Sequence, residues 1–450
     1  MGNFTRKPAQ TLKEENKFAE LGFRRNPFPI DPTVKPNSKD ERENGSIFLK
    51  ELRNFEFEQF KDKVINEPNK INLLMDYAAY RGRGIGKTAF LNYQKNQINS
   101  DFGDSISSGK QVLYSLYITP AADKKERKFW QLARTIYDAI MQEELLLIAF
   151  CRIRALSGLI NEEILTEINT NNLAETLAND NWLKEKGINI PQLNDYMTDV
   201  FQKEGITFRI ALEGLFSNTY NESFLKQIHT ENTDSFWRNK GMDLVFDTII
   251  RIFKTAEFSN CIILFDEAEK IITTQNFSER REFCDNLRYY FIDGSSLNAH
   301  ISFYKILMTI HPNSQELLLT HWNAAGLDRF SELGGEKAER NTIFFHPLEN
   351  VNAAYSLAKI YLKAARINES NEDDLKPFTE LSLELAITKS EGIPGKYLKL
   401  LYSVMENAAN EGLSEITESD MEKIWKTQVT IDATKKDPGN VLPNTKINLK

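Results

Sequence analysis

The sequence predicts an α/β protein with a parallel five-stranded core, a large helical insertion and a C-terminal helical lid. Three observations support this prediction. A glycine-rich loop follows an apolar run and leads into a helical pattern, four further apolar runs indicate strands, and the remaining chain has apolar residues at helical spacing. Strands that alternate with helical segments are typical of a parallel sheet. The expected strands are residues 71–78, 111–118, 261–267, 304–310 and 341–345.

The composition is that of a folded protein without a membrane-spanning segment. With 450 residues, of which 41% are hydrophobic, the chain can bury a large core and is long enough for about two to four structural units. No apolar run approaches the roughly 20 residues that a transmembrane helix needs. Three scattered cysteines and five histidines without metal-ligand spacing predict a reduced, cytoplasmic protein without structural zinc. The net charge of −8 argues against a surface that coats DNA broadly, but leaves a local basic groove open.

The chain is expected to consist of six parts. An N-terminal arm and helix, interpreted as packing elements rather than a partner site, precede the first part of the core. The helical insertion is far longer than a minimal domain needs, so we expect it to carry partner specificity. The last residues have little apolar content, which predicts a flexible tail. The parts are 1–66 (arm and helix), 67–118 (first part of the core), 119–258 (insertion), 259–348 (second part of the core), 349–428 (lid) and 429–450 (tail).

The glycine-rich loop at residues 81–88 reads Arg-Gly-Arg-Gly-Ile-Gly-Lys-Thr. It matches the phosphate-binding pattern G-x-x-x-x-G-K-[ST] except that Arg81 replaces the first glycine, and the alternative is a glycine-rich turn with an incidental lysine. Backbone N–H groups at the start of the next helix attract phosphate oxygens. Lys87 would neutralise the β- and γ-phosphates, and the Thr88 hydroxyl would ligate Mg²⁺. The sequence therefore predicts a P-loop NTPase that binds ATP through Gly82, Arg83, Gly84, Ile85, Gly86, Lys87, Thr88 and Ala89.

Two acids, Asp266 and Glu267, end the third expected strand. A buried strand would carry the Asp266 carboxylate to its tip, where it would hold Mg²⁺ opposite Thr88. Glu267 would polarise the attacking water as a general base. The alternative is a solvated strand end, but four apolar residues before the pair and the glycine loop upstream favour catalysis.

These features together resemble AAA+ ATPases, and among them the ExeA-type, transposition-regulator and archaeal-initiator ATPases, which are related to STAND ATPases. The leader at residues 21–28 resembles a Gly-aromatic…Asn-Pro-Phe opening. Residues 266–269, Asp-Glu-Ala-Glu, resemble Asp-Glu-Ala-Gln, and residues 307–312 resemble a strand that ends in Gly-Gln-Pro. The likeness covers roughly residues 20–118 and 259–428.

The resemblance implies roles for residues near the ends of the fourth and fifth strands. His311 falls at the sensor-1 position that would touch the γ-phosphate or the attacking water, with Asn313 as the second choice. The alternative is a histidine that caps a turn. Arg329 and Arg340 lie where related ATPases place an arginine finger that reaches a neighbouring subunit, and Arg329 is favoured. Arginine suits this role because it stays charged and binds two phosphate oxygens, although either residue could be a surface charge.

The lid carries one further candidate. Residues 390–396 resemble the Gly-Asn-Pro-Arg segment of these ATPases, with Gly395 at the arginine position. Lys396, one residue later, is therefore the candidate nucleotide contact of the lid.

The resemblance implies a regulatory ATPase that assembles or switches with ATP and recruits or licenses a partner. We expect a homo-oligomer and a protein effector that acts on DNA in defence, transposition or replication. A direct DNA contact is a candidate at the basic cluster of Lys124, Lys125, Arg127 and Lys128, and the alternative is a solvated helix face. Two other functions remain open: a STAND-like signalling switch with slow turnover, and a nucleotide-binding scaffold without catalysis.

Overall fold

The computed structural model describes eleven segments of the chain, which divide into two compact units. The helical unit contains residues 1–52, 81–86 and 346–450, and the sheet unit contains residues 53–80 and 87–345. Within the described residues, no helix has both the length and the apolar character needed to cross a bilayer. The described residues are 16–36, 38–67, 71–76, 84–103, 112–120, 127–206, 233–294, 303–334, 336–348, 350–368 and 375–434.

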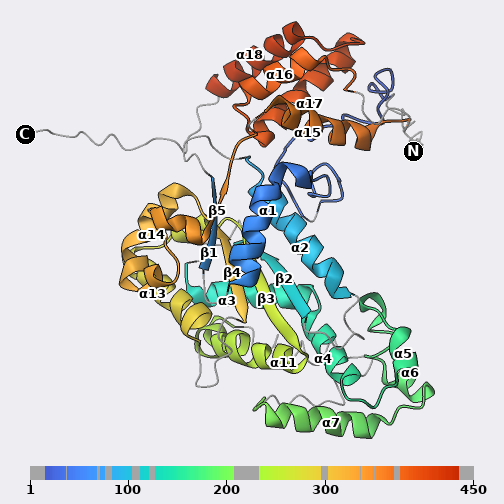
Figure 1. Ribbon diagram of the computed structural model, residues 1–450, viewed down its shortest axis with the longest axis vertical. Helices are drawn as coiled ribbons and strands as arrows, with labels where there is room; N and C mark the ends of the chain where they lie inside the picture. Colours follow the sequence, from blue (N-terminus) through green and yellow to red (C-terminus); the bar gives the residue numbers. More distant parts are fainter. Residues whose placement is uncertain are drawn as a thin grey trace, which may run out of the picture. The chain divides into compact units, whose positions relative to one another are not determined.

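Five strands form one sheet in the order β2-β3-β4-β1-β5 (Figure 1). Every neighbouring pair is parallel. This order is typical of AAA+ P-loop proteins, and it confirms the predicted α/β class and parallel five-stranded core. The largest difference from the expected strands is that β3 begins at Phe258 rather than at Cys261. The strands are β1 (Ile71–Asp76), β2 (Val112–Ile118), β3 (Phe258–Phe265), β4 (Tyr304–Thr309) and β5 (Thr342–Phe345).

The strands form because the sequence supplies continuous apolar runs for a sheet that is covered on both faces. Every residue of β4 is buried, and so is β1 from Ile71 to Met75. The one charged residue of β4, Lys305, donates a hydrogen bond to the carbonyl oxygen of Ile65. Burial lowers the pKa of Lys305, so this hydrogen bond compensates part of the cost of placing its ammonium group in the core.

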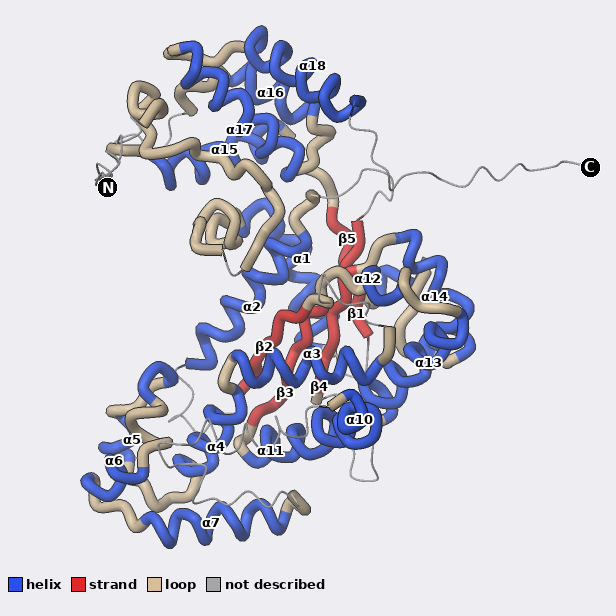
Figure 2. Tube along the Cα trace, turned by 180° about the vertical axis from the view of Figure 1, so that it is seen from behind, coloured by secondary structure: helices blue, strands red, loops and turns tan. Residues whose placement is uncertain are grey.

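Helices cover both faces of the sheet. On one face, α1, α2 and β5 meet where the Phe90 ring packs against Phe57, Phe60 and Phe345, with ring centroids 5.1 to 5.9 Å apart. α3 covers the opposite face, as the front and back views show together (Figure 1 and Figure 2). The helices and helical turns before β3 are α1 (Asn54–Phe60), η2 (Lys61–Asn66), α2 (Lys87–Gly103), α3 (Phe129–Gln142), α4 (Leu145–Ala155), α5 (Glu162–Thr166), η3 (Thr170–Asn172), α6 (Asp180–Glu185), α7 (Ile190–Lys203), α10 (Asp234–Phe236), η4 (Trp237–Gly241), η5 (Leu244–Thr248) and α11 (Ile249–Thr255).

Between β3 and β5 the chain is also helical. These elements are α12 (Glu269–Ile272), α13 (Phe277–Leu287), η6 (Arg288–Asp293), α14 (Pro312–Ala324), η7 (Leu327–Arg329) and η8 (Glu336–Arg340).

The helical insertion shares one hydrophobic core with the sheet. The apolar residues of α3 at helical spacing are buried, with Ala139 half-buried. α4 is buried along its whole length, including two arginines. One of them, Arg154, donates hydrogen bonds to the carbonyl oxygen of Leu177 (2.8 Å) and to the carboxylate of Asp180 (2.9 Å). This buried charge therefore has partners, and it ties α4 to the start of α6.

The C-terminal part of the chain is helical, as predicted. A second hydrophobic core lies among its four helices. The last helix continues to Thr434, which lies inside the predicted flexible tail, and residues 435–450 lie outside the described part of the chain. The elements of the helical unit are η1 (Lys50–Arg53, whose last residue belongs to the sheet unit), α15 (Val351–Ala365), α16 (Glu380–Lys389), α17 (Pro394–Glu411) and α18 (Glu418–Thr434).

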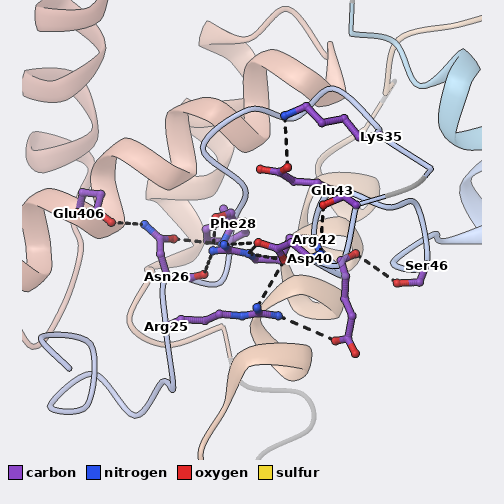
Figure 3. A network of polar contacts seen from close by, with 11 residues as sticks. Arg25, Asn26, Phe28, Lys35, Asp40, Arg42, Glu43, Ser46 and Glu406 are labelled. Carbon is purple, nitrogen blue, oxygen red and sulfur yellow. Dashed lines mark hydrogen bonds and ion pairs between the residues drawn. The ribbon is translucent and has the colours of Figure 1, made fainter. Parts of the chain in front are cut away.

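The N-terminal arm packs against these helices. Phe23 and Phe28 are buried in the same core as α15 to α18. Asn26 is buried between them, and its amide donates hydrogen bonds to the Tyr402 carbonyl oxygen and the Glu406 carboxylate of α17, both at 3.1 Å (Figure 3). Its side-chain oxygen accepts a hydrogen bond from the backbone N–H of Phe28 at 3.1 Å. The arm segment around Asn26 is thus part of the helical unit.

Arg42 also holds the arm segment around Asn26, through the backbone of that segment. Its guanidinium group donates hydrogen bonds to the carbonyl oxygens of Asn26 (2.6 Å) and Phe28 (3.2 Å). It also binds the Asp40 carboxylate, and this hydrogen bond lowers the pKa of Asp40 to about 2 (Figure 3). Residues that look like a loop in sequence are therefore held by a connected set of polar contacts.

Replacing Asn26 tests whether the arm stabilises the helical unit. Asn26→Ala removes the hydrogen bonds to Tyr402, Glu406 and Phe28, and we expect it to lower the free energy of unfolding by about 2 kcal/mol. Urea unfolding followed by circular dichroism measures this change. Asn410→Ala is the matched control, because Asn410 is an exposed residue of α17 that accepts a hydrogen bond from Lys17 and should change stability by about 0.5 kcal/mol or less. Equal effects of the two variants would contradict a stabilising role for Asn26.

Candidate functional site

Two glycines of the loop have left-handed backbones. Gly84 and Gly86 both have a φ of +104°, a conformation that side chains with a Cβ rarely adopt. α2 begins at Lys87 directly after them, so the predicted contacts Lys87, Thr88 and Ala89 lie in the first turn of a helix. The predicted contacts Gly82 and Arg83 lie outside the described residues, as does Arg81.

Lys87 forms an ion pair with Asp76. The distance between the Lys87 Nζ and the Asp76 Oδ1 atoms is 2.6 Å, and both side chains are largely buried. Asp76 is the last residue of β1, and it was not among the site residues predicted from the sequence. The available signal was a single acid at the end of an otherwise apolar strand, just before the loop. Any phosphate group that binds Lys87 has to compete with this carboxylate.

The Asp266 carboxylate accepts four hydrogen bonds although the residue is only 3% exposed. Its Oδ2 atom accepts from the Thr88 hydroxyl (2.6 Å) and from the Tyr117 hydroxyl (3.0 Å). Its Oδ1 atom accepts from the Thr309 hydroxyl (2.7 Å) and from the backbone N–H of Glu267 (3.0 Å). The structure thus brings together Thr88 and Asp266, the two predicted Mg²⁺ ligands, which lie 178 positions apart in the chain.

Tyr117 and Thr309 are site residues that the sequence motifs did not identify. Tyr117 is the second-last residue of β2, and Thr309 is the last residue of β4. Both strands neighbour β3, which carries Asp266 at its end. The carboxyl ends of parallel strands meet at one edge of a sheet. A polar residue at the end of an apolar strand was therefore the sequence feature that could have identified Tyr117 and Thr309.

Glu267 is more exposed than Asp266 and has a different environment. Its backbone is left-handed, with a φ of +54°, and its N–H also donates to the Thr309 hydroxyl at 2.7 Å. Its carboxylate is 38% exposed and forms an ion pair with Lys270. The Thr119 hydroxyl donates to the same carboxylate at 3.4 Å. The predicted general base is therefore held by a cation one helical turn away.

Glu269 is a third acid next to this pair. Burial raises its pKa, and the negative charges of Asp266 and Glu267 add to this effect while Lys87 opposes it. Its Oε2 atom is buried without a hydrogen-bond partner. Glu269 begins α12, so the turn after β3 places it within electrostatic range of Asp266, Glu267 and Lys87. No group of three or more histidine, cysteine or acidic residues is arranged to hold a metal ion in the part of the chain that the structure describes.

His311 is the N-cap residue of α14. Its Nδ1 atom accepts a hydrogen bond from the backbone N–H of Asn313 at 3.2 Å. This contact agrees with the capping alternative and leaves the sensor-1 role a prediction. Arg329 and Arg340 are exposed residues at the ends of η7 and η8. Among the described residues, no hydrogen bond or ion pair joins these arginines to Lys87 or to the acids after β3.

In the helical unit, the segment at residues 390–396 contacts the glycine-rich loop through its backbone. The N–H of Gly395 donates a hydrogen bond to the carbonyl oxygen of Gly84 at 2.8 Å. A Cβ atom on Gly395 would lie 3.0 Å from the Cα and O atoms of Gly84, so a side chain would displace the loop. Lys396 is exposed and forms an ion pair with Glu391 at 3.2 Å. The backbone of Gly395, rather than the Lys396 side chain, makes the contact with the loop.

The basic cluster is described in part. Lys124 and Lys125 lie outside the described residues. Lys128 forms ion pairs with Glu282 (2.9 Å) and Glu279 (3.8 Å) of α13. The Nε atom of Arg127 is buried without a hydrogen-bond partner. The two described members are therefore partly neutralised or partly buried, which weakens the case for DNA contact at this point.

Comparisons with known proteins give distant likenesses. No family profile and no curated protein matches the chain. Two solved structures of the Aeropyrum pernix ORC2 protein, one with ADPNP and ADP and one with ADP, are 9% and 8% identical, each with a TM-score of 0.41. The alignments cover 88% of this chain and 69% and 70% of those chains. Drosophila ORC bound to DNA is 11% identical with a TM-score of 0.39, over 96% of this chain and 72% of that chain.

The Lys87–Asp76 ion pair leads to a prediction for nucleotide affinity. Asp76→Asn removes the carboxylate that competes with phosphate for Lys87, so it should strengthen ATP binding about fivefold, which corresponds to roughly 1 kcal/mol. Titration with a fluorescent ATP analogue measures this affinity. Asp247→Asn is the control, because Asp247 forms a comparable ion pair with Arg251 of α11 at 2.9 Å. Weaker binding by Asp76→Asn would instead identify Asp76 as a group that orients Lys87.

Proposed function

We propose that this chain is a Mg²⁺-dependent ATPase of the AAA+ type. The observation that carries the proposal is the contact between Thr88 and Asp266 beside Lys87 (2.6 Å from hydroxyl to carboxylate). A lysine, a hydroxyl and a carboxylate meet at the N-terminus of a helix, after two glycines with positive φ. This combination supports phosphate and Mg²⁺ chemistry, because backbone N–H groups and a cation attract phosphate, and oxygen atoms are the ligands that Mg²⁺ prefers.

The residues present fit ATP and Mg²⁺. Gly86 leaves open space where a Cβ atom would stand, which a loop approached by phosphate oxygens requires. Mg²⁺ prefers oxygen ligands and takes one or two of them from the protein, with the rest from phosphates and water. Thr88 and Asp266 would hold the ion, and the ion would neutralise charge that develops on the phosphates.

The other residues act on the substrate and on water. Lys87 binds the β- and γ-phosphates after it exchanges the Asp76 carboxylate for phosphate oxygens. Glu267 accepts a proton from the attacking water, which requires that its carboxylate turn away from Lys270. Thr309 holds the Asp266 carboxylate and the Glu267 backbone together, so the proposed metal ligand and the proposed base keep a fixed relative position.

We further propose that the chain assembles as a homo-oligomer and recruits or licenses a protein effector that acts on DNA. The resemblance to transposition-regulator and archaeal-initiator ATPases motivates this role. Arg329 is the proposed finger for a neighbouring subunit, and its exposure at the end of η7 supports this assignment. Direct DNA contact by Lys124, Lys125, Arg127 and Lys128 is the weakest part of the proposal, because Lys128 already has acidic partners.

A second candidate function is a slow nucleotide-dependent switch. The observation that favours it is that both Lys87 and Glu267 are neutralised by partners within the chain, Asp76 and Lys270. Both ion pairs have to open before hydrolysis, which would make turnover slow. Purified protein that retains ATP or ADP and hydrolyses it independently of protein concentration would favour this switch over an assembling ATPase.

Lys87→Ala tests the loop. It removes the charge that we assign to the β- and γ-phosphates, so ATP affinity should fall at least about a hundredfold, which corresponds to roughly 3 kcal/mol. Isothermal titration calorimetry with ATP and Mg²⁺ measures the change. Lys254→Ala, at an exposed lysine of α11, controls for the loss of a lysine elsewhere in the sheet unit. Unchanged affinity in the Lys87 variant would remove the loop from the nucleotide site.

Glu267→Gln tests the general base. The amide has nearly the same shape as the carboxylate but cannot accept a proton, so we expect unchanged ATP affinity and hydrolysis that is slower by about 10²- to 10⁴-fold. Phosphate release in steady state measures the rate. Glu282→Gln is the control, because Glu282 is an acid on α13 that also forms an ion pair with a lysine, Lys128. Full hydrolysis by the Glu267 variant would transfer the role to another acid, and Glu269 would be the first choice.

A further inference from the structure

Tyr117 faces the same side of the sheet as Asp266. In the parallel pair of β2 and β3, Tyr117 lies opposite Leu264, and Asp266 follows Leu264 by two positions. Side chains two positions apart in a strand, and side chains of directly paired residues, point to the same face. The alternation of β2 therefore directs the Tyr117 hydroxyl toward the acids at the end of β3.

The hydroxyl of Tyr117 acts on the same oxygen as Thr88. Asp266 Oδ2 accepts hydrogen bonds from Tyr117 (3.0 Å) and Thr88 (2.6 Å), whereas Oδ1 accepts from Thr309 and from the Glu267 backbone. With two donors on each oxygen, the rotation of the carboxylate is fixed. Tyr117 is thus one of two side chains that determine where Oδ2 points.

The Tyr117 hydroxyl contacts Asp266 without being a proposed metal ligand itself. Thr88 has a second task in the proposed function, because its oxygen would bind Mg²⁺. Tyr117 has no such task, so its hydrogen bond to Oδ2 is available in both the free and the nucleotide-bound protein.

We propose that Tyr117 is a positioning residue that holds the Asp266 carboxylate in the orientation needed for Mg²⁺. This inference rests on the proposed function of the same site. Groups that hydrogen-bond to metal-binding carboxylates orient these ligands, and their loss typically weakens metal affinity by about 10- to 100-fold. Tyr117 should therefore affect nucleotide binding only when Mg²⁺ is present, because its hydroxyl contacts the proposed metal ligand and not the loop.

Tyr114 provides a matched control on the same strand. Its hydroxyl donates a hydrogen bond to the Glu143 carboxylate at 3.0 Å. Tyr114 and Tyr117 are therefore both largely buried tyrosines that bond to a carboxylate at the same distance, but Tyr114 does so away from the candidate site. A phenylalanine at either position removes one hydroxyl and keeps the ring.

The experiment compares Tyr117→Phe and Tyr114→Phe in the full-length chain. The affinity for a fluorescent ATP analogue is measured in EDTA and across a Mg²⁺ titration, and thermal unfolding is measured for both variants. We expect Tyr117→Phe to raise the Mg²⁺ concentration at half-maximal binding at least about tenfold and to leave the affinity in EDTA unchanged. Tyr114→Phe should leave the Mg²⁺ dependence as in the wild type, although it should lower stability to a similar degree.

Two results would overturn the inference. One is a wild-type Mg²⁺ dependence in Tyr117→Phe, and the other is an equal loss of affinity with and without Mg²⁺ in both tyrosine variants, which would indicate a purely structural role. If the proposed function itself is wrong, the result differs, because wild-type protein would then bind no ATP analogue either in EDTA or with Mg²⁺. Binding by the wild type that is lost in Lys87→Ala, together with an unaltered Tyr117→Phe variant, would overturn the inference on Tyr117 alone.

Discussion

The candidate site depends on the buried carboxylate of Asp266. A buried carboxylate without partners is several kcal/mol less favourable than one that is fully hydrogen-bonded, so the surrounding elements have to deliver donors to it. Thr88 supplies one from the first turn of α2, Tyr117 one from β2, and Thr309 one from β4. These three hydroxyls fix the end of β3 against two neighbouring strands and the loop helix. The same contacts that satisfy the acid therefore set the positions of the groups proposed to bind the metal and phosphate.

The sheet could be predicted from the sequence because its strands are continuous apolar runs, which a parallel sheet with helices on both faces requires. The loop could be predicted because its glycines, lysine and threonine have a fixed spacing. Tyr117 and Thr309 could not be recognised in this way. Each is a polar residue inside or at the end of a strand, and its meaning depends on which strand lies beside it. The order that puts β3 between β2 and β4 is a property of the folded sheet, which strand patterns in the sequence do not specify.

The ion pairs of Lys87 with Asp76 and of Glu267 with Lys270 could not be predicted from the sequence either. Asp76 lies 11 positions before Lys87, and no helical or strand periodicity relates the two residues, because the glycine-rich loop separates them. Lys270 lies one helical turn after Glu267, a spacing that permits a salt bridge but also occurs on many solvated helices. The spacing of the motif predicted a lysine, a hydroxyl and two acids at one site. It did not indicate that Lys87 and Glu267 each form an ion pair with a nearby residue.

Gly84 and Gly395 form a close backbone contact within the helical unit. The N–H of Gly395 donates a hydrogen bond to the carbonyl oxygen of Gly84 at 2.8 Å. A Cβ atom on Gly395 would lie 3.0 Å from the Cα and O atoms of Gly84, so the loop backbone would have to shift to accept a side chain there. The absence of a side chain at residue 395 therefore permits this close backbone approach. Because Gly84 also has a positive φ, a rotation of its peptide group would break the hydrogen bond to the start of α17. The state of the loop is in this way linked to α17 through backbone atoms alone.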